Sequence, residues 1–450
     1  MGQTPSKFAM VVDQLAHSIK NGEFTNGDRL PPQRDLASKL GVSIGVITDA
    51  YKELGKSGLV TARIGDGTYV NCTDSNLIQS PEINMAFNVP APVPEAEILF
   101  QEVLATIAKN KIICSAMMKY PSELGSFRHR AAFSEWLKKL GGSGQVSRVM
   151  LTGGAHNAIA CVLRAITRPG DVIISEEVSY HGLKLLAKEL RLKVVSASSD
   201  DEGLLADGVD YLAKTQSAKV LFCIPSLQMP TGITMSLGRR RELAAVAKSN
   251  KLLVIEDCVH ALGQVAPLPA LSVFLPEQSF LVGSFSKTTF PALRVGFIDA
   301  DPKWMGKISL ALRNDSLTVG SLMPEVLVQL MESGRLAKLI QLQRSVVIER
   351  YKAAFHAIQI FSKKHGVSLA AKGDKEFPFL WLTLPNGLQA KEVSDELQKK
   401  GVLTRPSNYF QMGRCATPEA LRISLNSPTS TAEMKRGIGI IGESIFKLQN

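Results

Sequence analysis

The sequence predicts an α/β protein in which a small N-terminal domain precedes a much larger one. Two observations carry this prediction. Helical and strand patterns fill the first 71 residues, and over most of the rest helical stretches alternate with short apolar runs. The chain has 450 residues, of which 45% are apolar and 21% charged, so a disordered or fibrous protein is excluded.

The small N-terminal domain is predicted from periodicity and capping. Apolar residues over 8–19 follow helical spacing, and a short helix is expected over 33–40. Ser43 then caps a third helix. Strands at 59–62 and 68–71 flank a glycine-containing turn, which predicts a hairpin. Three helices and a two-stranded wing together make a winged helix-turn-helix.

The large domain follows a proline-containing segment without periodicity. We expect the winged helix over residues 1–75, a linker over 76–94 and the large domain over 95–450. Short apolar runs predict a mostly parallel sheet with strands at 172–175, 193–196, 220–224, 252–255, 280–283 and 295–298. Further strands at 378–384 and 421–425 predict a smaller α+β subdomain from about residue 320 to 450.

Composition excludes several functional classes. No apolar run approaches the ~20 residues of a membrane-spanning helix, and residues 1–25 do not resemble a signal peptide. The six cysteines form no C-x-x-C pair and the seven histidines no metal-spaced cluster, so we expect no metal and a cytoplasmic protein. The net charge of +11 suits a nucleic-acid partner, although residues 1–75 carry equal numbers of basic and acidic side chains.

Candidate chemistry in the large domain lies at strand ends. Lys287 stands just beyond the strand at 280–283, and Arg294 follows seven residues later. A partly desolvated lysine at a strand end can form a Schiff base with an aldehyde. Ser284 and Arg294 can hold a phosphate beside it. Taken alone, the pattern also fits an ordinary solvated lysine.

Other positions add weaker signals. Asp257 ends an apolar strand, where α/β folds place site residues and where it could pair with a protonated ring nitrogen. Gly154, Ala155 and His156 open a helix, whose free N–H groups suit a phosphate. Tyr180 could stack on a ring. The alternatives are an ordinary strand-end acid, a plain turn and core packing.

The order of these motifs, with Pro230-Thr231-Gly232 between them and Arg422 near the end, resembles the type I fold of pyridoxal-phosphate-dependent aminotransferases over about residues 84–450. That resemblance implies a seven-stranded sheet. Joined to a winged helix containing the segment from Gly27 to Arg34, the chain resembles the MocR subfamily of GntR transcriptional regulators. The resemblance implies a homodimer that binds double-stranded DNA and pyridoxal 5'-phosphate.

The resemblance also implies roles at the cofactor. Lys287 would form the internal aldimine, and Asp257 would keep the pyridine nitrogen protonated. Arg422 would clamp the carboxylate of a substrate or effector. Tyr180 would stack on the ring, and Tyr120 would reach the phosphate of the other subunit. The phosphate ligands within the chain would be Gly154, Ala155, His156, Ser284 and Arg294.

DNA contacts are implied for six residues of the winged helix: Arg34, Ser43, Thr48, Arg63, Gly65 and Gly67. Related proteins often carry an arginine at the start of the recognition helix, where this chain has Ile44. With few cations on that helix and no net charge, one domain alone should bind DNA weakly. Two half-sites in a dimer would compensate.

The cofactor site departs from the family pattern at two positions. Val259 replaces a tyrosine and Met229 replaces an asparagine that donate hydrogen bonds in many relatives, and neither Val nor Met can donate. Cys258, His260, Gln228 or water could substitute. Transamination is therefore expected to be slow or absent.

Two functions from different classes follow. The first is a transcriptional regulator that senses pyridoxal phosphate, an amino compound, or both. The alternative is an active aminotransferase carrying a vestigial winged helix. A cofactor-binding scaffold with neither activity is a third possibility. Intact turn and wing glycines and the lost donors favour the regulator.

Overall fold

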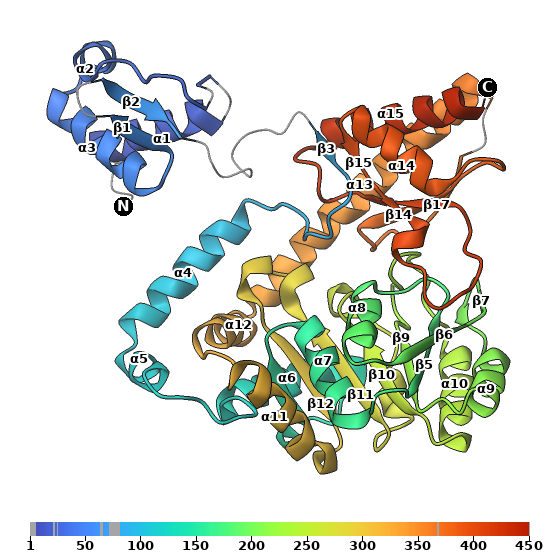
Figure 1. Cartoon of the computed structure of the whole chain (residues 1–450). Coiled ribbons are helices and arrows are strands. Elements are labelled where there is room, and N and C mark those ends of the chain that lie inside the picture. The colour runs from blue at the N-terminus through green and yellow to red at the C-terminus, as the bar shows by residue number, and fades with distance from the viewer. Residues whose placement is uncertain are drawn as a thin grey trace. The chain divides into compact units, whose positions relative to one another are not determined.

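The computed structural model describes residues 6–20, 23–24, 26–63, 66–71, 82–366 and 369–449. The chain divides into two compact units, Met1–Glu82 and Ile83–Asn450 (Figure 1). Each unit encloses its own apolar core. Within the described ranges, no helix combines the length and the apolar character needed to span a bilayer.

The first unit is a winged helix, as the sequence predicted. Its elements are α1 (Lys7–Lys20), α2 (Gln33–Leu40), α3 (Ile44–Lys56), β1 (Val60–Arg63) and β2 (Gly67–Val70). Strands β1 and β2 pair antiparallel to form the wing. Gly41 ends α2 in a left-handed conformation with φ of 62°, and the Ser43 hydroxyl accepts a hydrogen bond from Val46 N at the start of α3. These two caps set the helix-turn-helix, whose core includes Leu15, Ile47 and Leu54.

The second unit is built on a seven-stranded sheet with strand order β4-β12-β11-β10-β9-β5-β6. The strands are β4 (Val149–Thr152), β5 (Val172–Glu176), β6 (Lys193–Ala197), β9 (Val220–Cys223), β10 (Leu253–Asp257), β11 (Ser279–Ser284) and β12 (Gly296–Ala300). Neighbours pair in parallel, except that β12 runs antiparallel to β4 and β11. The predicted mostly parallel sheet is confirmed. Strand β4 is an addition to the six expected runs.

Helices cover both faces of this sheet. Side chains of α7 (Ala155–Ile166), α8 (Gly182–Glu189) and α11 (Pro302–Ser316) share one core with it. The opposite face packs against α4 (Glu95–Lys109), α6 (Phe127–Leu137), α9 (Ala206–Thr215), α10 (Leu237–Ser249) and α12 (Leu322–Glu332). Alternation along the strands explains both cores: Met150 faces the first and Leu151 the second. The remaining short elements are α5 (Lys111–Met117) and the hairpin of β7 (Ser199–Asp200) and β8 (Gly203–Leu204).

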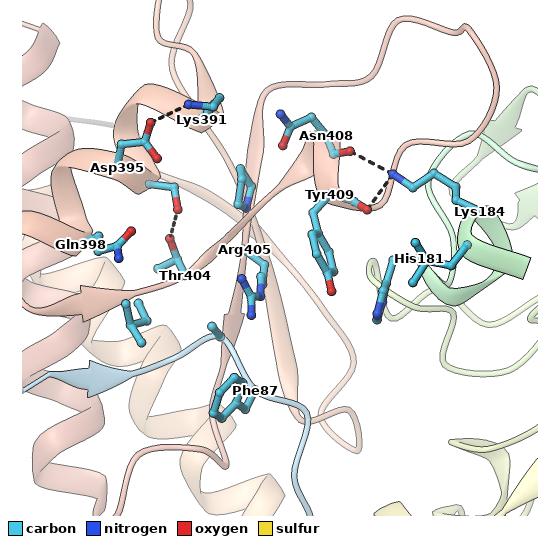
Figure 2. Close-up of a pocket in the computed structure, with 15 residues that line it drawn as sticks. Phe87, His181, Lys184, Lys391, Asp395, Gln398, Thr404, Arg405, Asn408 and Tyr409 are labelled. Carbon is cyan, nitrogen blue, oxygen red and sulfur yellow. Dashed lines mark hydrogen bonds and ion pairs between the residues drawn. The ribbon is translucent and has the colours of Figure 1, made fainter. Parts of the chain in front are cut away.

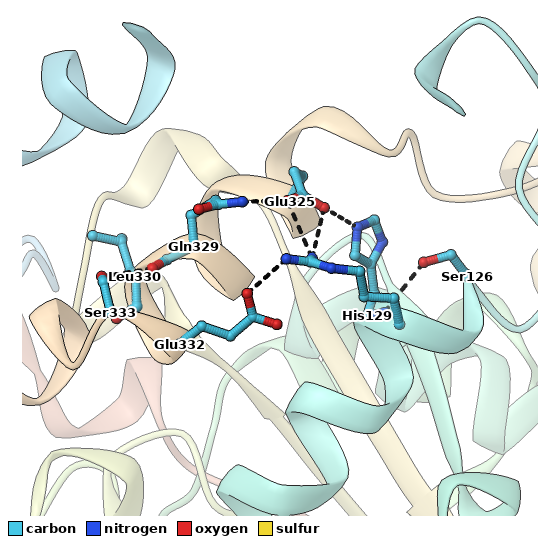
Figure 3. A network of polar contacts seen from close by, with 8 residues as sticks. Ser126, His129, Glu325, Gln329, Leu330, Glu332 and Ser333 are labelled. Atoms are coloured by element: carbon cyan, nitrogen blue, oxygen red, sulfur yellow. Dashed lines mark hydrogen bonds and ion pairs between the residues drawn. The ribbon is translucent and has the colours of Figure 1, made fainter. Parts of the chain in front are cut away.

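A buried carboxylate joins α6 to α12. Glu325 is 3% exposed, and its Oε2 lies 2.8 Å from His129 Nε2 and 3.0 Å from Arg128 Nη1 (Figure 3). Gln329 donates a further hydrogen bond to Glu325 Oε1 at 2.9 Å. Burial raises the pKa of Glu325, but the His129 and Gln329 hydrogen bonds and the Arg128 charge outweigh it and lower the pKa below its ordinary value.

The smaller subdomain packs around an antiparallel sheet of order β13-β14-β17-β16. These strands are β13 (Ala370–Lys372), β14 (Phe379–Thr383), β17 (Ala420–Ser424) and β16 (Arg405–Pro406), and the helices are α13 (Arg335–His365), α14 (Ala390–Lys399) and α15 (Thr431–Gln449). Two apolar strands expected here, at 378–384 and 421–425, correspond to β14 and β17.

The predicted linker differs from the structure at its C-terminal end. Strand β3 (Ile83–Asn84) pairs in parallel with β15 (Val402–Leu403), and Met85 is fully buried. Residues 83–94 therefore belong to the second unit instead of a free linker. The proline-spotted sequence hides this, because a two-residue strand leaves no periodic pattern. Residues 76–81 lie outside the described ranges.

Candidate functional site

Three strands of the large sheet end at one edge and deliver the candidate side chains there. Strands β4, β10 and β11 point the same way, since β12 is antiparallel to both β4 and β11. Asp257 is the last residue of β10, Ser284 is the last of β11, and Lys287 follows in a short 3-10 turn. The carboxyl ends of parallel strands are where α/β folds bind ligands.

A cavity of about 230 Å³ lies at this edge. Its lining includes eight of the expected residues: Ala155, His156, Tyr180, Asp257, Ser284, Lys287, Arg294 and Arg422. Gly154 lies directly before α7, and Arg294 Nη2 lies 3.4 Å from the carbonyl oxygen of the preceding Gly153. Tyr120 does not line this cavity in its own chain, because its side chain is 83% exposed after α5.

Lys287 is held at the cavity by the main chain. Its Nζ donates a hydrogen bond to the carbonyl oxygen of Asn88 at 2.7 Å. Burial lowers the pKa of Lys287 to about 8, and the charges of Arg294 and Arg422 act in the same direction. More of this amine is therefore unprotonated near neutral pH than of an ordinary lysine, which favours a nucleophilic role.

Asp257 is a buried acid with little hydrogen-bond support. It is 6% exposed, and its Oδ1 accepts a hydrogen bond from Val259 N at 2.9 Å. Burial raises the pKa of Asp257 to about 7, and the nearby Glu176 and Glu256 add to the effect. A protonated ring nitrogen in the cavity would supply the positive charge that this carboxylate lacks.

A group of residues suited to binding an anion lies in one corner of the cavity, where α7 begins. Gly154 has φ of +100°, and a Cβ placed there would lie 3.0 Å from Arg294 Nη2, so glycine leaves room for the guanidinium. Arg294 itself has φ of 49°, a left-handed conformation that costs ~1–3 kcal/mol for most residues and is concentrated at functional sites. The hydroxyls of Ser284 and Ser286 lie 2.9 Å apart beside it. This corner combines helix N–H groups, hydroxyls and one cation.

Tyr180 closes another side of the cavity. Its hydroxyl lies 3.1 Å from His156 Nδ1, and a Cβ at Gly182 would collide with its ring. Burial raises the pKa of Tyr180 to about 12, so the phenol stays protonated. Burial and the Arg294 charge lower the pKa of His156. The ring of Tyr180 is thus fixed in place as a neutral aromatic wall.

Arg422 is a buried cation whose hydrogen bonds are incompletely satisfied. Its guanidinium lies 4.3 Å from the centre of the Phe379 ring and 5.0 Å from that of Phe410. Nη2 donates to the carbonyl of Ala86, Nη1 lies 3.5 Å from Met229 Sδ, and Nε has no partner among the described residues. Burial lowers the pKa of Arg422 to about 9. Such a group gains most from a carboxylate.

The two substituted donor positions both face the cavity. Val259 and Met229 line it, so neither can donate a hydrogen bond to a ligand there. Gln228 does not replace them, because its amide is engaged with the Val178 carbonyl at 2.6 Å and with the Thr231 hydroxyl at 2.6 Å. Cys258 is buried against Phe285 and Phe297 and lines no part of the cavity.

Of the three side chains considered as substitutes, only His260 reaches the cavity. Its Nε2 lies 3.4 Å from Asn88 Nδ2. Burial lowers the pKa of His260 to about 3, with the charge of Lys287 adding to the effect. The imidazole is therefore neutral and can donate only from the nitrogen that carries its single proton.

Sequence reasoning missed Asn88, His181 and Ser286, which also line the cavity. Asn88 lies in the segment expected to be a linker, and it contributes a main-chain carbonyl, which any residue type provides. No sequence signal could have found that contact. Ser286 and His181 are each adjacent in the sequence to a predicted site residue, so the motif pattern could have predicted them.

The expected DNA-binding residues of the first unit fall into two groups. Arg34 and Arg63 are exposed and make no ion pair among the described residues, although the Arg63 guanidinium lies 4.4 Å from the centre of the Tyr69 ring. Ser43 and Thr48 each make a hydrogen bond within the domain. The Ser43 hydroxyl caps α3, and the Thr48 hydroxyl lies 2.7 Å from Gln33 Oε1.

The remaining expected DNA contacts lie in the wing, and Ile44 stands at the start of α3. Gly67 has φ of +142°, and a Cβ there would lie 2.6 Å from Arg29 Nε, so the hairpin requires glycine. Gly65 lies outside the described residues. Ile44 is 47% exposed, which leaves an apolar side chain at the first position of α3.

Comparisons with known proteins match each of the two units to a family. Residues 83–441 match the aminotransferase class I and II family, and residues 7–70 match the bacterial regulatory proteins of the gntR family. The uncharacterized HTH-type transcriptional regulator YdeF of Bacillus subtilis (strain 168) is 27% identical over 96% of this chain and 93% of its own. The HTH-type pyridoxine biosynthesis transcriptional regulator PdxR of Corynebacterium glutamicum is 27% identical over 75% of this chain and 77% of its own.

Solved structures give the same fold for the second unit. Kynurenine aminotransferase of Pyrococcus horikoshii, in complex with PMP, has a TM-score of 0.75 at 23% identity and covers 83% of this chain and 92% of its own. Identity at this level establishes the fold alone. The chain therefore belongs to the aminotransferase class I and II family and, with a GntR-type domain ahead of that fold, has the architecture of the MocR-type transcriptional regulators.

Proposed function

We propose that this regulator binds pyridoxal 5'-phosphate through Lys287 and uses the site to sense the cofactor, an amino compound, or both. The observation that carries the proposal is the grouping of three features in one cavity: an amine with a pKa of about 8, a buried carboxylate and an anion-binding corner. The amine suits the aldehyde of pyridoxal 5'-phosphate, the carboxylate suits its ring nitrogen, and the anion-binding corner suits its phosphate.

The residues of the cavity fit this cofactor. Two buried polar atoms beside it, Asn88 Oδ1 and Arg422 Nε, have no hydrogen-bond partner among the described residues, as expected where a ligand completes the site. When bound, pyridoxal phosphate supplies an aldehyde that accepts an amine and a ring that takes up electrons. Lys287 would provide the amine, Asp257 would hold a proton at the ring nitrogen, and Arg294 would neutralise phosphate charge.

Regulation without rapid catalysis is supported by Met229 and Val259. Both line the cavity at positions where the resemblance to aminotransferases implies hydrogen-bond donors, and Gln228 is engaged elsewhere. An active aminotransferase with a vestigial winged helix is the alternative function. We favour slow or absent turnover, since loss of an oriented donor commonly costs ~10²–10³ in rate.

A homodimer is supported by the apolar surface around α5. Ile112, Met118, Tyr120 and Phe127 are between 70% and 83% exposed. Large apolar side chains that are exposed this close together in the sequence favour an interaction site, and a second copy of the chain would cover them. Tyr120 would then be available to the cavity of the partner subunit.

The experiment that tests the proposal recovers genomic DNA bound by the purified protein, with and without added pyridoxal phosphate. We expect a small set of enriched fragments, with occupancy that changes when the cofactor is added. Enrichment of no fragment above bulk DNA under either condition would contradict the regulator. Equal enrichment under both conditions would contradict cofactor sensing.

A further inference from the structure

A second cavity of about 730 Å³ adjoins the one around Lys287, and its charge is unbalanced (Figure 2). His181 lines both cavities. The larger lining contains three cations, Lys184, Lys391 and Arg405, and one carboxylate, Asp395. Asp395 lies 2.8 Å from Lys391, so this acid is already paired.

Arg405 is left without a carboxylate. Among the described residues it makes no ion pair, and its guanidinium lies 5.0 Å from the centre of the Tyr409 ring. That ring packs 4.5 Å, centre to centre, from the ring of His181. Figure 2 shows Arg405 extending into the space between Phe87, Tyr409 and His181, with no polar contact drawn to it.

Strand pairing places this cation beside Arg422. Arg405 in β16 is directly opposite Arg422 in the antiparallel partner β17. Opposite residues project to the same face with Cβ atoms ~4.5–5.5 Å apart, and like charges there repel. Burial lowers the pKa of Arg422, and the Arg405 charge adds to the effect. The pair therefore gains from a ligand that brings negative charge to both guanidinium groups.

Lys184 adds a third positive charge near the boundary between the cavities. Its Nζ donates to the carbonyls of Tyr409 at 2.9 Å and Asn408 at 3.3 Å, neither of which neutralises it. Phe87 and Leu185 line the same cavity and are 53% and 61% exposed. An apolar wall beside unpaired cations suits a methylene chain that ends in an acid.

Building on the proposed function, we propose that the two cavities together bind an amino acid whose side chain ends in a carboxylate. Its α-carboxylate would lie at Arg422 and its side-chain carboxylate at Arg405, with the amine toward Lys287. Arg405 is the residue that would distinguish this class from neutral amino acids.

The test uses full-length protein loaded with pyridoxal phosphate and two isosteric pairs of probes, L-glutamate with L-glutamine and L-aspartate with L-asparagine. The readouts are the probe concentration at half-maximal change in the visible absorption of the cofactor, and the shift in thermal unfolding temperature. In at least one pair, we expect the acidic probe to act at about one-tenth of the concentration that the neutral probe needs, or below that. The reason is that hydrogen bonds between charged groups are stronger than those to a neutral amide.

Three variants separate the possible outcomes. Arg405→Gln should abolish the acidic preference, whereas Arg405→Lys should keep part of it because the charge remains. Arg414→Gln removes an exposed cation that lines neither cavity and should leave the preference unchanged. Unaltered cofactor absorption in Arg405→Gln shows that this variant is folded.

Equal responses to the acidic and neutral probes in wild type would overturn the inference and leave cofactor binding intact. A preference that survives Arg405→Gln would also overturn it. Wild-type protein that takes up no cofactor would instead contradict the proposed function, and the inference with it.

Discussion

Lys287 Nζ lies 2.7 Å from the carbonyl oxygen of Asn88, a residue 199 positions earlier in the chain. The contact ties the end of β11 to the first few residues of the second unit. It holds the amine at the wall of the cavity, where burial lowers its pKa to about 8.

Replacing Lys287 with alanine should abolish the visible absorption that appears when the protein is mixed with pyridoxal phosphate. That conjugation needs an amine condensed with the aldehyde, and Lys287 is the one lysine among the described residues that line the cavity. Lys193→Ala, which removes an exposed lysine from β6, is the matched control and should keep the absorption. Identical spectra for wild type and Lys287→Ala would exclude this lysine.

Asp257 should make the cofactor-free protein less stable as pH rises. Its pKa is about 7 in the folded chain against an ordinary 3.8, so between about pH 4 and 7 the folded state holds a proton that the unfolded state has lost. The free energy of unfolding then falls by up to about 1.4 kcal/mol per pH unit. Asp257→Asn lacks this dependence, so its stability relative to wild type should increase from pH 4.5 to 7 in urea unfolding. A difference that is constant with pH would contradict the assignment.

The wild type should transaminate far below the ordinary ~10 s⁻¹ with a broad panel of amino donors and keto acids. The double variant Met229→Asn with Val259→Tyr should be at least about tenfold faster, because each change restores a donor to the cavity lining. Turnover near the ordinary rate in wild type would favour the aminotransferase.

Glu325→Gln should lower the free energy of unfolding by ~1–3 kcal/mol near neutral pH, because Arg128 loses the carboxylate that it pairs with and the contact with His129 is weakened. The lowered pKa of Glu325 means that its contribution is present above its ordinary pKa of 4.5 and is lost as pH falls through the folded value. The control is Glu332→Gln, which breaks the exposed ion pair to Arg128 and should change stability by less than ~1 kcal/mol. Equal effects of the two variants would rule out a special role for the buried acid.

DNA binding should require a dimer and two half-sites, and it should fall steeply with salt. Arg34→Ala should cost ~1–3 kcal/mol and relax sequence preference if Arg34 contacts a base. Lys39→Ala removes an exposed charge from the same helix and should weaken all sequences alike. Mobility-shift titrations at several salt concentrations check both. Loss of the same size on specific and bulk DNA would assign Arg34 to phosphate.

The sequence was sufficient for most strands of the large sheet and for most of the residues that line the cavity. Strand-end positions such as Asp257 and Lys287 follow from alternating helical and apolar runs, because the topology of a parallel sheet brings carboxyl ends together. Contacts made by the main chain could not be predicted from the sequence. The carbonyls of Ala86 and Asn88 accept hydrogen bonds from side chains more than 190 residues away in the sequence. The residue types Ala and Asn give no indication of these contacts.

The outcome at Gln228 was also beyond sequence reasoning. A glutamine beside Met229 looks available to a ligand, yet its amide is satisfied by Val178 and Thr231. Which of two neighbouring polar groups faces a cavity depends on long-range packing. The pairing of Arg405 with Arg422 is set by register between β16 and β17 in the same way.

The short stretch from Ala86 to Asn88 gives main-chain carbonyls to both Arg422 and Lys287. A ligand that takes the place of either carbonyl exchanges a hydrogen bond within the chain for one of its own, so the affinity gained there is the difference between the two contacts. The stretch begins three residues after Ile83, where the second unit starts. A ligand that exchanged with these carbonyls would therefore release residues at the start of the second unit from their contacts with the cavity.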